Sequence, residues 1–164
     1  MKFKNLVLTL GVLMMLAFTS MAAAAPSQVN RSMTAINAAK AEIPAVCELV
    51  GYNVDGDTSI ITFKDPNTLE RYVVDVNTAT AKVQEIEVKG ATFVMGSTMV
   101  TKTPDDIEKI VLKKYPNAYE IVITQGQDGN NIYYIADFLT DKFDGELKLD
   151  PVTGAICERE LEYF

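Results

Sequence analysis

The stretch Asp150-Pro151-Val152-Thr153-Gly154 decides the fold, because a second version of it, Asn77-Thr78-Ala79-Thr80-Ala81, lies 73 positions earlier. The same offset places Asp128-Gly129 on Asp55-Gly56. A repeat whose turn residues stay in register indicates one supersecondary unit built twice. We therefore interpret the function of the chain from a duplicated unit rather than from isolated reactive residues.

Both versions of this stretch have the composition of a turn. The Asp150 carboxylate can accept hydrogen bonds from the backbone that follows it, Pro151 presets φ, and Gly154 supplies a positive φ. Thr153 and its counterpart Thr80 occupy the same place in the two turns, after Asp150 and Asn77 respectively. The earlier turn ends in alanine, for which a positive φ costs about 1 kcal/mol, so we expect a different shape there.

The two Asp-Gly pairs predict hairpins. Asp55-Gly56 lies between strands predicted at residues 46–54 and 59–64, and Asp128-Gly129 lies between strands predicted at residues 118–125 and 132–138. Asp-Gly between two strand-like segments is a strong hairpin signal because both residues tolerate positive φ. A third and a fourth strand follow in each copy, the third at residues 69–76 and 146–149, and the fourth at residues 82–89 and 155–163.

A helix is predicted at the start of each copy. Thr103 is a favourable N-cap, Pro104 suits the first helical position, and Pro116 ends the second helix. The first helix is predicted from Thr34, as its cap, to the residue before Pro44. The fold class predicted is α+β, with two repeats that each pack one helix on a four-stranded antiparallel sheet.

The domain organisation follows from these units. We expect a flexible segment at residues 25–33, a first and degenerate repeat at 34–89, a connector at 90–102 and a second repeat at 103–164. Either repeat alone would have a marginal core at roughly 70 residues. We therefore expect the two repeats to pack together.

Residues 1–24 have the pattern of a secretory signal peptide. Lys2 and Lys4 precede an apolar run, and small residues end it. Loss of these two lysines changes the net charge from −7 to −9. Such acidity argues against nucleic-acid binding and anionic membrane surfaces. We expect an exported protein, in the periplasm, cell envelope or extracellular space, with no stable membrane insertion after signal cleavage.

The chain contains no histidine, which removes the usual general base and the commonest neutral metal ligand. Histidine-dependent nucleophilic and zinc chemistry is thereby excluded. We expect no catalytic residues, no enzymatic activity and no cofactor. The two cysteines, Cys47 and Cys157, form either one disulfide or two separately buried thiols, since an exported protein permits both.

The second copy resembles PepSY domains. The resemblance rests on Tyr115-Pro116-Asn117-Ala118, Asp128-Gly129, Tyr133-Tyr134-Ile135 and the stretch from Asp150 to Ile156. It implies a non-catalytic module, found in propeptides of thermolysin-like proteases and in cell-envelope proteins, that inhibits peptidases or regulates their activity. Two helix-plus-sheet units are also similar to β-lactamase inhibitor proteins at the level of fold. The family has no catalytic residues to transfer.

The residues that we expect to contact a partner form an acidic ladder. Glu85 and Glu87 alternate with apolar residues in copy one, and Glu158, Glu160 and Glu162 do so in copy two. Their carboxylates form either a surface that steers a basic partner or a merely solvated sheet face. Phe93, in the apolar part of the connector, is a further candidate, either packed in the core or on a sheet edge that accepts a partner strand.

Calcium binding is a weaker hypothesis. Residues 53–57 and the acids Asp137, Asp141 and Asp144 supply oxygen ligands, but neither stretch has the spacing of a calcium loop. The leading hypothesis is an exported binding protein that inhibits or regulates an envelope or secreted peptidase. The alternative is an envelope protein that binds a small ligand or a cation through loop carboxylates.

Overall fold

The computed structural model describes residues 28–90 and 96–164. Two helices and eight strands follow one another along the chain: α1 Gln28–Glu42, β1 Glu48–Asp55, β2 Thr58–Lys64, β3 Arg71–Asn77, β4 Val83–Lys89, α2 Pro104–Lys114, β5 Tyr119–Asp128, β6 Asn131–Leu139, β7 Phe143–Leu149 and β8 Ile156–Tyr163. The signal peptide predicted at residues 1–24 and the candidate contact residue Phe93 lie outside the described residues.

All eight strands belong to one antiparallel sheet, in the order β1-β2-β3-β4-β8-β7-β6-β5. The predicted fold class, two repeats each with its own four-stranded sheet, is therefore wrong. Strand β4 pairs with β8 over the five positions from Glu85↔Glu162 to Lys89↔Glu158. If these two strands did not pair, both would be edges with unpaired backbone groups. Their pairing removes two edges and makes the sheet continuous.

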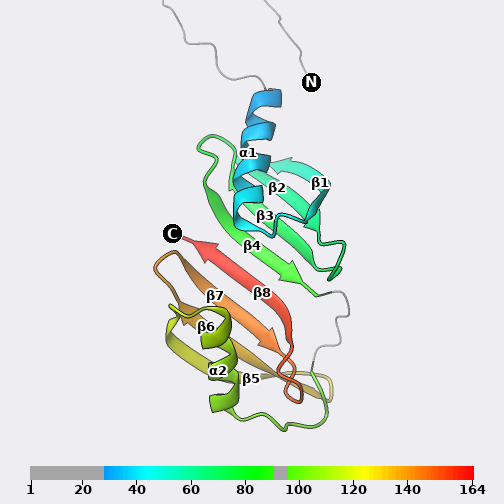
Figure 1. Cartoon of the computed structure of the whole chain (residues 1–164), viewed down its shortest axis with the longest axis vertical. Coiled ribbons are helices and arrows are strands. Elements are labelled where there is room, and N and C mark those ends of the chain that lie inside the picture. Colours follow the sequence, from blue (N-terminus) through cyan, green and yellow to red (C-terminus); the bar gives the residue numbers. More distant parts are fainter. Residues whose placement is uncertain (1–27, 91–95) are drawn as a thin grey trace, which may run out of the picture.

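Both helices lie on the same face of the sheet, as Figure 1 shows. Helix α1 packs on β2 and β3, and α2 packs on β5 and β6. The core lies between these helices and the strands, with Ile61, Phe63, Val74, Tyr134 and Phe138 almost completely buried. The central strands β4 and β8 run between the two helices.

The two helices begin differently from one another. The predicted N-cap Thr103 is confirmed: its hydroxyl accepts from the backbone N–H of Asp106, whose carboxylate in turn accepts from the Thr103 N–H at 3.0 Å. Helix α1 begins at Gln28, six residues before the predicted cap Thr34. The Thr34 hydroxyl donates to the Asn30 carbonyl at 2.8 Å, a bond made inside helices. Residues 28–33, predicted to be flexible, are thus helical.

The predicted Asp-Gly hairpins are confirmed. Gly56 connects β1 to β2 and Gly129 connects β5 to β6, each with φ 58°. Positive φ is the reason that glycine serves at these positions.

The two longer turns have the same hydrogen-bond pattern, contrary to the different shape expected for the alanine turn. The N–H of Gly154 donates to the Asp150 carbonyl at 2.9 Å, and that of Ala81 donates to the Asn77 carbonyl at 2.8 Å. The side chains of Asp150 and Asn77 accept from the backbone that follows. Ala81 adopts φ 56°, so the turn retains its shape at the cost of strain at this alanine.

In the described part of the chain, neither helix has the length and apolar composition needed to cross a membrane.

Candidate functional site

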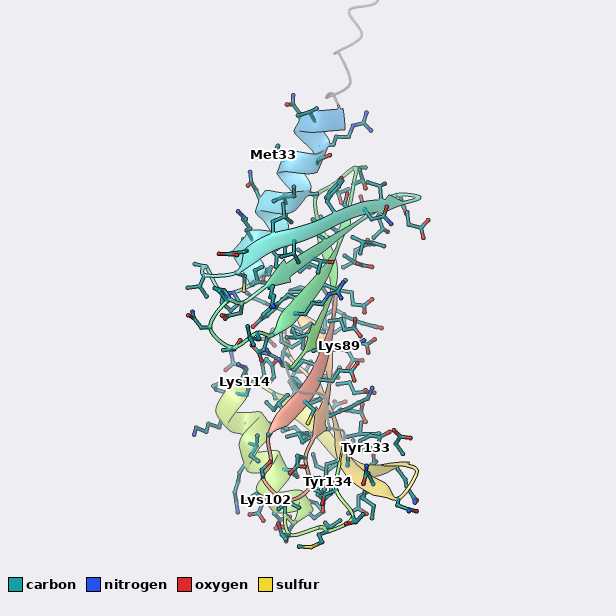
Figure 2. All side chains as sticks on the ribbon, turned by 90° about the vertical axis from the view of Figure 1, so that its right-hand side faces the viewer. Met33, Lys89, Lys102, Lys114, Tyr133 and Tyr134 are labelled. Atoms are coloured by element: carbon teal, nitrogen blue, oxygen red, sulfur yellow. The ribbon has the colours of Figure 1, made fainter. Side chains whose placement is uncertain are left out.

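The candidate site is the open face of the sheet, by which we mean the face opposite α1 and α2. Figure 1 shows both helices in front of the sheet, so the open face is turned away from the viewer there. Figure 2 shows α2 beside the strands of the lower half of the sheet, which are seen nearly edge-on. Strand residues alternate between the two faces, so burial of one set against the helices leaves the other set on the open face. Eight carboxylates occupy adjacent positions there and are called the acidic face: Asp75, Glu85, Glu87, Asp137, Asp144, Glu146, Glu160 and Glu162.

The acidic face consists of two rows that run across the strands. In the first row Asp75 lies opposite Glu85, Glu85 opposite Glu162, and Glu162 opposite Asp144. This row thus passes from β3 through β4 and β8 to β7. Like charges directly opposite one another destabilise an antiparallel pair, and every step of this row is such a pair.

The second row lies beside the first. Glu87 is opposite Glu160, Glu160 opposite Glu146, and Glu146 opposite Asp137. It extends from β4 to β6, so together the rows cover the five adjacent strands β3, β4, β8, β7 and β6.

The pKa values of four of these carboxyls, Asp75, Glu85, Asp137 and Glu160, are raised, first by burial and then by neighbouring carboxylates. Partial burial, followed by the charges of Glu160, Asp75 and Glu162, raises the pKa of Glu85. Burial and then Glu146 raise the pKa of Glu160, which Lys148 opposes. The ionised forms are therefore less favourable in the folded chain than in isolated residues.

The same holds at both ends of the acidic face. The pKa of Asp75 is raised by burial and by Glu87, and that of Asp137 by burial, Glu146 and Asp144. An approaching cation would relieve this repulsion at each of these positions.

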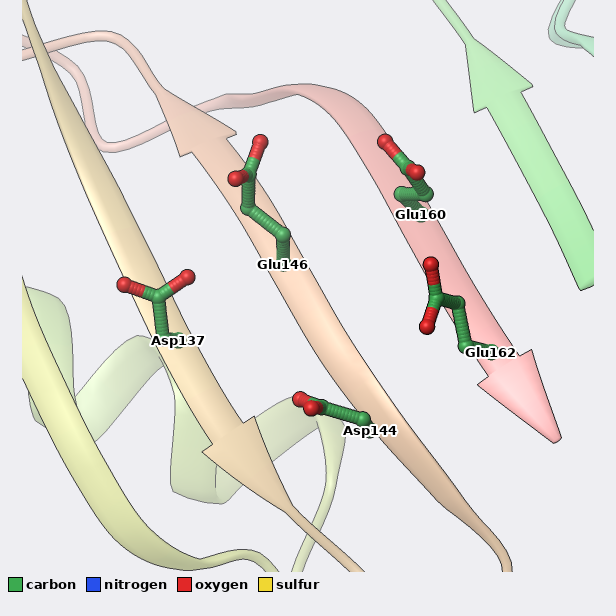
Figure 3. A pocket seen from close by; sticks show the side chains of 5 residues that line it. All are labelled: Asp137, Asp144, Glu146, Glu160 and Glu162. Atoms are coloured by element: carbon green, nitrogen blue, oxygen red, sulfur yellow. The ribbon is translucent and has the colours of Figure 1, made fainter. Parts of the chain in front are cut away.

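Five of the carboxylates surround a shallow hollow of about 190 Å³, shown in Figure 3. Within residues 28–90 and 96–164, however, no three acidic or cysteine side chains are arranged to hold a metal ion. The hollow has the charge that suits a lysine or arginine side chain from another protein. Asp137 and Asp144, which we considered as calcium ligands in loops, lie instead on strands β6 and β7.

A basic row borders the acidic face on one side. The Lys89 ammonium lies 2.7 Å from Glu87 and 3.9 Å from Glu158, and the Lys148 ammonium lies 3.4 Å from Glu158. Arg71 is opposite Lys89 in the sheet and continues this row. Glu158 is thus paired with two cations, whereas Glu87 and Glu146, at the border of the acidic face, are each paired with one, Glu87 with Lys89 and Glu146 with Lys148 at 3.4 Å.

The structure brings four of the predicted contact residues together and adds four that the sequence analysis missed as contact residues, two of which it considered only as calcium ligands. Glu85, Glu87, Glu160 and Glu162 all belong to the acidic face. The missed ones are Asp75, Asp137, Asp144 and Glu146. The alternation used for the glutamates would have found three of them. Val74 and Val76 point inward, so Asp75 points outward. Buried Ala136 and Phe138 imply the same for Asp137, and Leu147 implies it for Glu146.

Both cysteine thiols are free. Cys47 is buried beyond the end of α1, and Cys157 lies half-buried on β8. Burial raises the pKa of both thiols, so both are poor nucleophiles. The sequence left open one disulfide or two separate thiols, and the structure has two separate thiols.

A charged pair on the opposite, helix-covered face was not predicted. The Arg159 guanidinium on β8 lies 3.0 Å from a Glu70 carboxylate oxygen, and the side chain of Arg159 is only 11% exposed. It also lies over the Tyr72 ring, 5.8 Å from its centroid. This contact links the two halves of the chain on the helix side of the sheet.

Comparisons with known proteins identify no family. No family model matches the chain, and no curated protein matches it. Among solved structures, a protein assigned as a lipoprotein from Clostridium difficile 630 is similar at 18% identity and a TM-score of 0.32, over 78% of this chain and 90% of that one. A BLIP-like protein from Bacteroides fragilis NCTC 9343 is similar at 11% identity and a TM-score of 0.34, over 79% and 85%. TM-scores this low establish neither a function nor a partner.

Proposed function

We propose that the chain is an exported, non-catalytic binding protein that docks its acidic face on a basic surface of a protein partner. One observation carries this proposal: six pairs of carboxylates lie directly opposite one another on the sheet face that, among the described residues, no helix covers. Such an arrangement destabilises the isolated protein. Binding of a basic surface would relieve the repulsion, so the arrangement favours the complex over the free chain.

The charge pattern also supports specificity. The basic row of Arg71, Lys89 and Lys148 lies beside the acidic face and marks its boundary on one side. A partner must therefore place its cations over the two acidic rows and avoid placing them over the basic row. Complementary potentials of this kind speed the encounter and fix its orientation.

The partner that we propose is an envelope or secreted peptidase. This part of the proposal rests on the resemblance of residues 103–163 to PepSY domains and on the signal-peptide pattern of residues 1–24. The mechanism would be steric. The acidic face would bind a basic region at the substrate cleft of the peptidase and block the cleft, without offering a peptide bond that the peptidase can cleave. The cation-binding alternative lacks a three-ligand group among the described residues, so we do not propose it.

Affinity capture with a matched pair of variants tests the proposal. The exported chain and its Glu160→Lys and Glu108→Lys variants are used as bait for the envelope and secreted proteins of the producing cell. Glu108 is exposed on α2, so the second variant makes the same charge change away from the acidic face. We expect a protein that the wild type and Glu108→Lys retain and that Glu160→Lys loses.

The magnitude follows from ordinary surface charge pairs. An exposed pair contributes about 0.2–1 kcal/mol, and reversal replaces attraction with repulsion of similar size. The resulting change of about 0.4–2 kcal/mol corresponds to roughly 2- to 30-fold in Kd. Equal retention by all three baits would contradict the acidic face as the docking surface. A retained protein that is not a peptidase, or a peptidase whose activity is unchanged, would contradict only the identity of the partner.

A further inference from the structure

A groove lies on the helix side of the sheet, between the C-terminal ends of α1 and α2. It has a volume of about 370 Å³, within the range of roughly 300–1,000 Å³ typical of ligand pockets. The strands β4 and β8 pass beneath it, where Figure 1 shows no helix over the centre of the sheet. Ile86, Val88 and Leu161 form an apolar floor.

Two cations reach one end of this groove. Arg159 extends from β8, and its guanidinium donates to the Glu70 carboxylate at 3.0 Å and to the Tyr72 hydroxyl at 3.5 Å. Lys114 is the last residue of α2 and lies at the rim; Figure 2 labels it at that end of the helix. Among the described residues, the Lys114 ammonium takes part in no ion pair.

The charges at this end are not balanced. Burial and the nearby Arg159 lower the pKa of Lys114, and Glu70 is the carboxylate that opposes this effect. Glu70 is already bound by Arg159. The other carboxylate of the groove, Glu42, accepts a hydrogen bond from the Tyr163 hydroxyl at 3.2 Å. Glu42 keeps its charge in this contact, but Glu70 is the carboxylate that acts on both Lys114 and Arg159. At this end of the groove one carboxylate therefore serves two cations.

We propose that this groove binds a small amphipathic anion, with a carboxylate head between Lys114 and Arg159 and an apolar body on the floor of the groove. A carboxylate there would receive charge-assisted hydrogen bonds, which are about twice as strong as neutral ones. The apolar body would lie against Leu161 and the ring of Phe143, which also lines the groove. A concave, largely apolar site with a few convergent polar groups is the usual form of a small-molecule site. This site is independent of the acidic face, which lies on the other side of the sheet.

The test compares 4-phenylbutyrate with its neutral analogue 4-phenylbutan-1-ol, titrated into the full exported chain at low-millimolar concentrations and followed by backbone amide NMR. We expect the acid to bind about tenfold more tightly than the alcohol, with shifts at Ile86 and Leu161. Lys114→Gln should weaken binding of the acid several-fold and leave binding of the alcohol unchanged, because Arg159 remains as the second donor. Lys113→Gln, which removes an exposed charge from the same helical turn, should leave it unchanged.

Each contrary result overturns the proposal. Equal binding of acid and alcohol would show that no cation recognises the head group. Shifts that occur only outside the groove, or no binding of the acid in the millimolar range, would exclude this groove as its site. An equal loss in Lys113→Gln and Lys114→Gln would reduce the effect to general electrostatics, and unchanged affinity in Lys114→Gln would remove the lysine from the site.

Discussion

Removal of one carboxylate from the middle of the acidic face should stabilise the protein. In Glu160→Gln, the side chain keeps its size and loses the charge that faces Glu87 on β4 and Glu146 on β7. A directly opposite like-charge pair costs about 0.2–1 kcal/mol, so two such pairs cost about 0.4–2 kcal/mol. Attraction to Lys148 offsets part of this cost. We expect a net gain of about 1 kcal/mol at neutral pH and low salt.

The measurement is urea unfolding of wild type and variant, followed by circular dichroism. The midpoint should rise with an unchanged slope, because the surface exposed on unfolding stays the same. The gain should shrink with added salt, since the screening length falls from about 30 Å at 0.01 M to about 3 Å at 1 M. Glu108→Gln on α2, which removes an exposed charge away from the acidic face, is the matched control and should change stability by less than about 0.5 kcal/mol.

The pH dependence provides an independent check. Because the pKa of Glu160 is raised in the folded state, folding becomes less favourable as pH rises through the range between its ordinary and its raised pKa. Below the ordinary pKa the group is protonated in both states and this cost is absent. The advantage of Glu160→Gln should therefore be absent in acid and complete at neutral pH. A destabilised variant, or a gain that neither salt nor acid alters, would refute the repulsion argument.

Three further predictions concern the fold. Ala81→Gly should stabilise the chain by about 0.5–1 kcal/mol in thermal unfolding, because glycine removes the strain of φ 56°. Ala79→Gly, in the same turn but without positive φ, should not stabilise it. Equal effects of the two substitutions would exclude strain as the cause. Glu70→Gln should destabilise by about 2 kcal/mol in urea unfolding, since it leaves the mostly buried Arg159 guanidinium without its counter-ion; an unchanged midpoint would show that the pair contributes nothing. Alkylation of the unfolded, unreduced protein, followed by mass spectrometry, should modify both cysteines, and no modification would reveal a disulfide.

Local signals predicted much of the chain. Asp-Gly pairs identified two hairpins, and Thr103 identified the start of α2, because the information for a turn or a cap lies within a few residues. The start of α1 was missed because Thr34, although a good cap residue, bonds backward inside the helix instead. The residues around Thr34 are compatible both with an N-cap and with a position inside the helix, so the local sequence did not distinguish the two.

The pairing of β4 with β8 could not be predicted in this way. In both strands apolar and charged residues alternate, as in any strand with one buried face. Neither strand carries a residue that specifies which strand lies beside it in the sheet. The extent of the acidic face depends on that pairing, because it places Glu85 opposite Glu162 and Glu87 opposite Glu160. Sequence alternation thus identified the outward-facing glutamates of β4 and of β8, but it did not predict that they lie opposite one another.

The most direct test of the proposed docking surface measures stability and affinity on one variant in one buffer. For Glu160→Gln, the free energy of unfolding is compared with the Kd for the protein partner identified by capture. If the carboxylates of the acidic face bind a basic partner, the two quantities should change in opposite directions. The variant should be more stable to unfolding and should bind the partner several-fold more weakly. Unchanged or tighter binding by the stabilised variant would contradict the account, because the repulsion would then have no role in recognition.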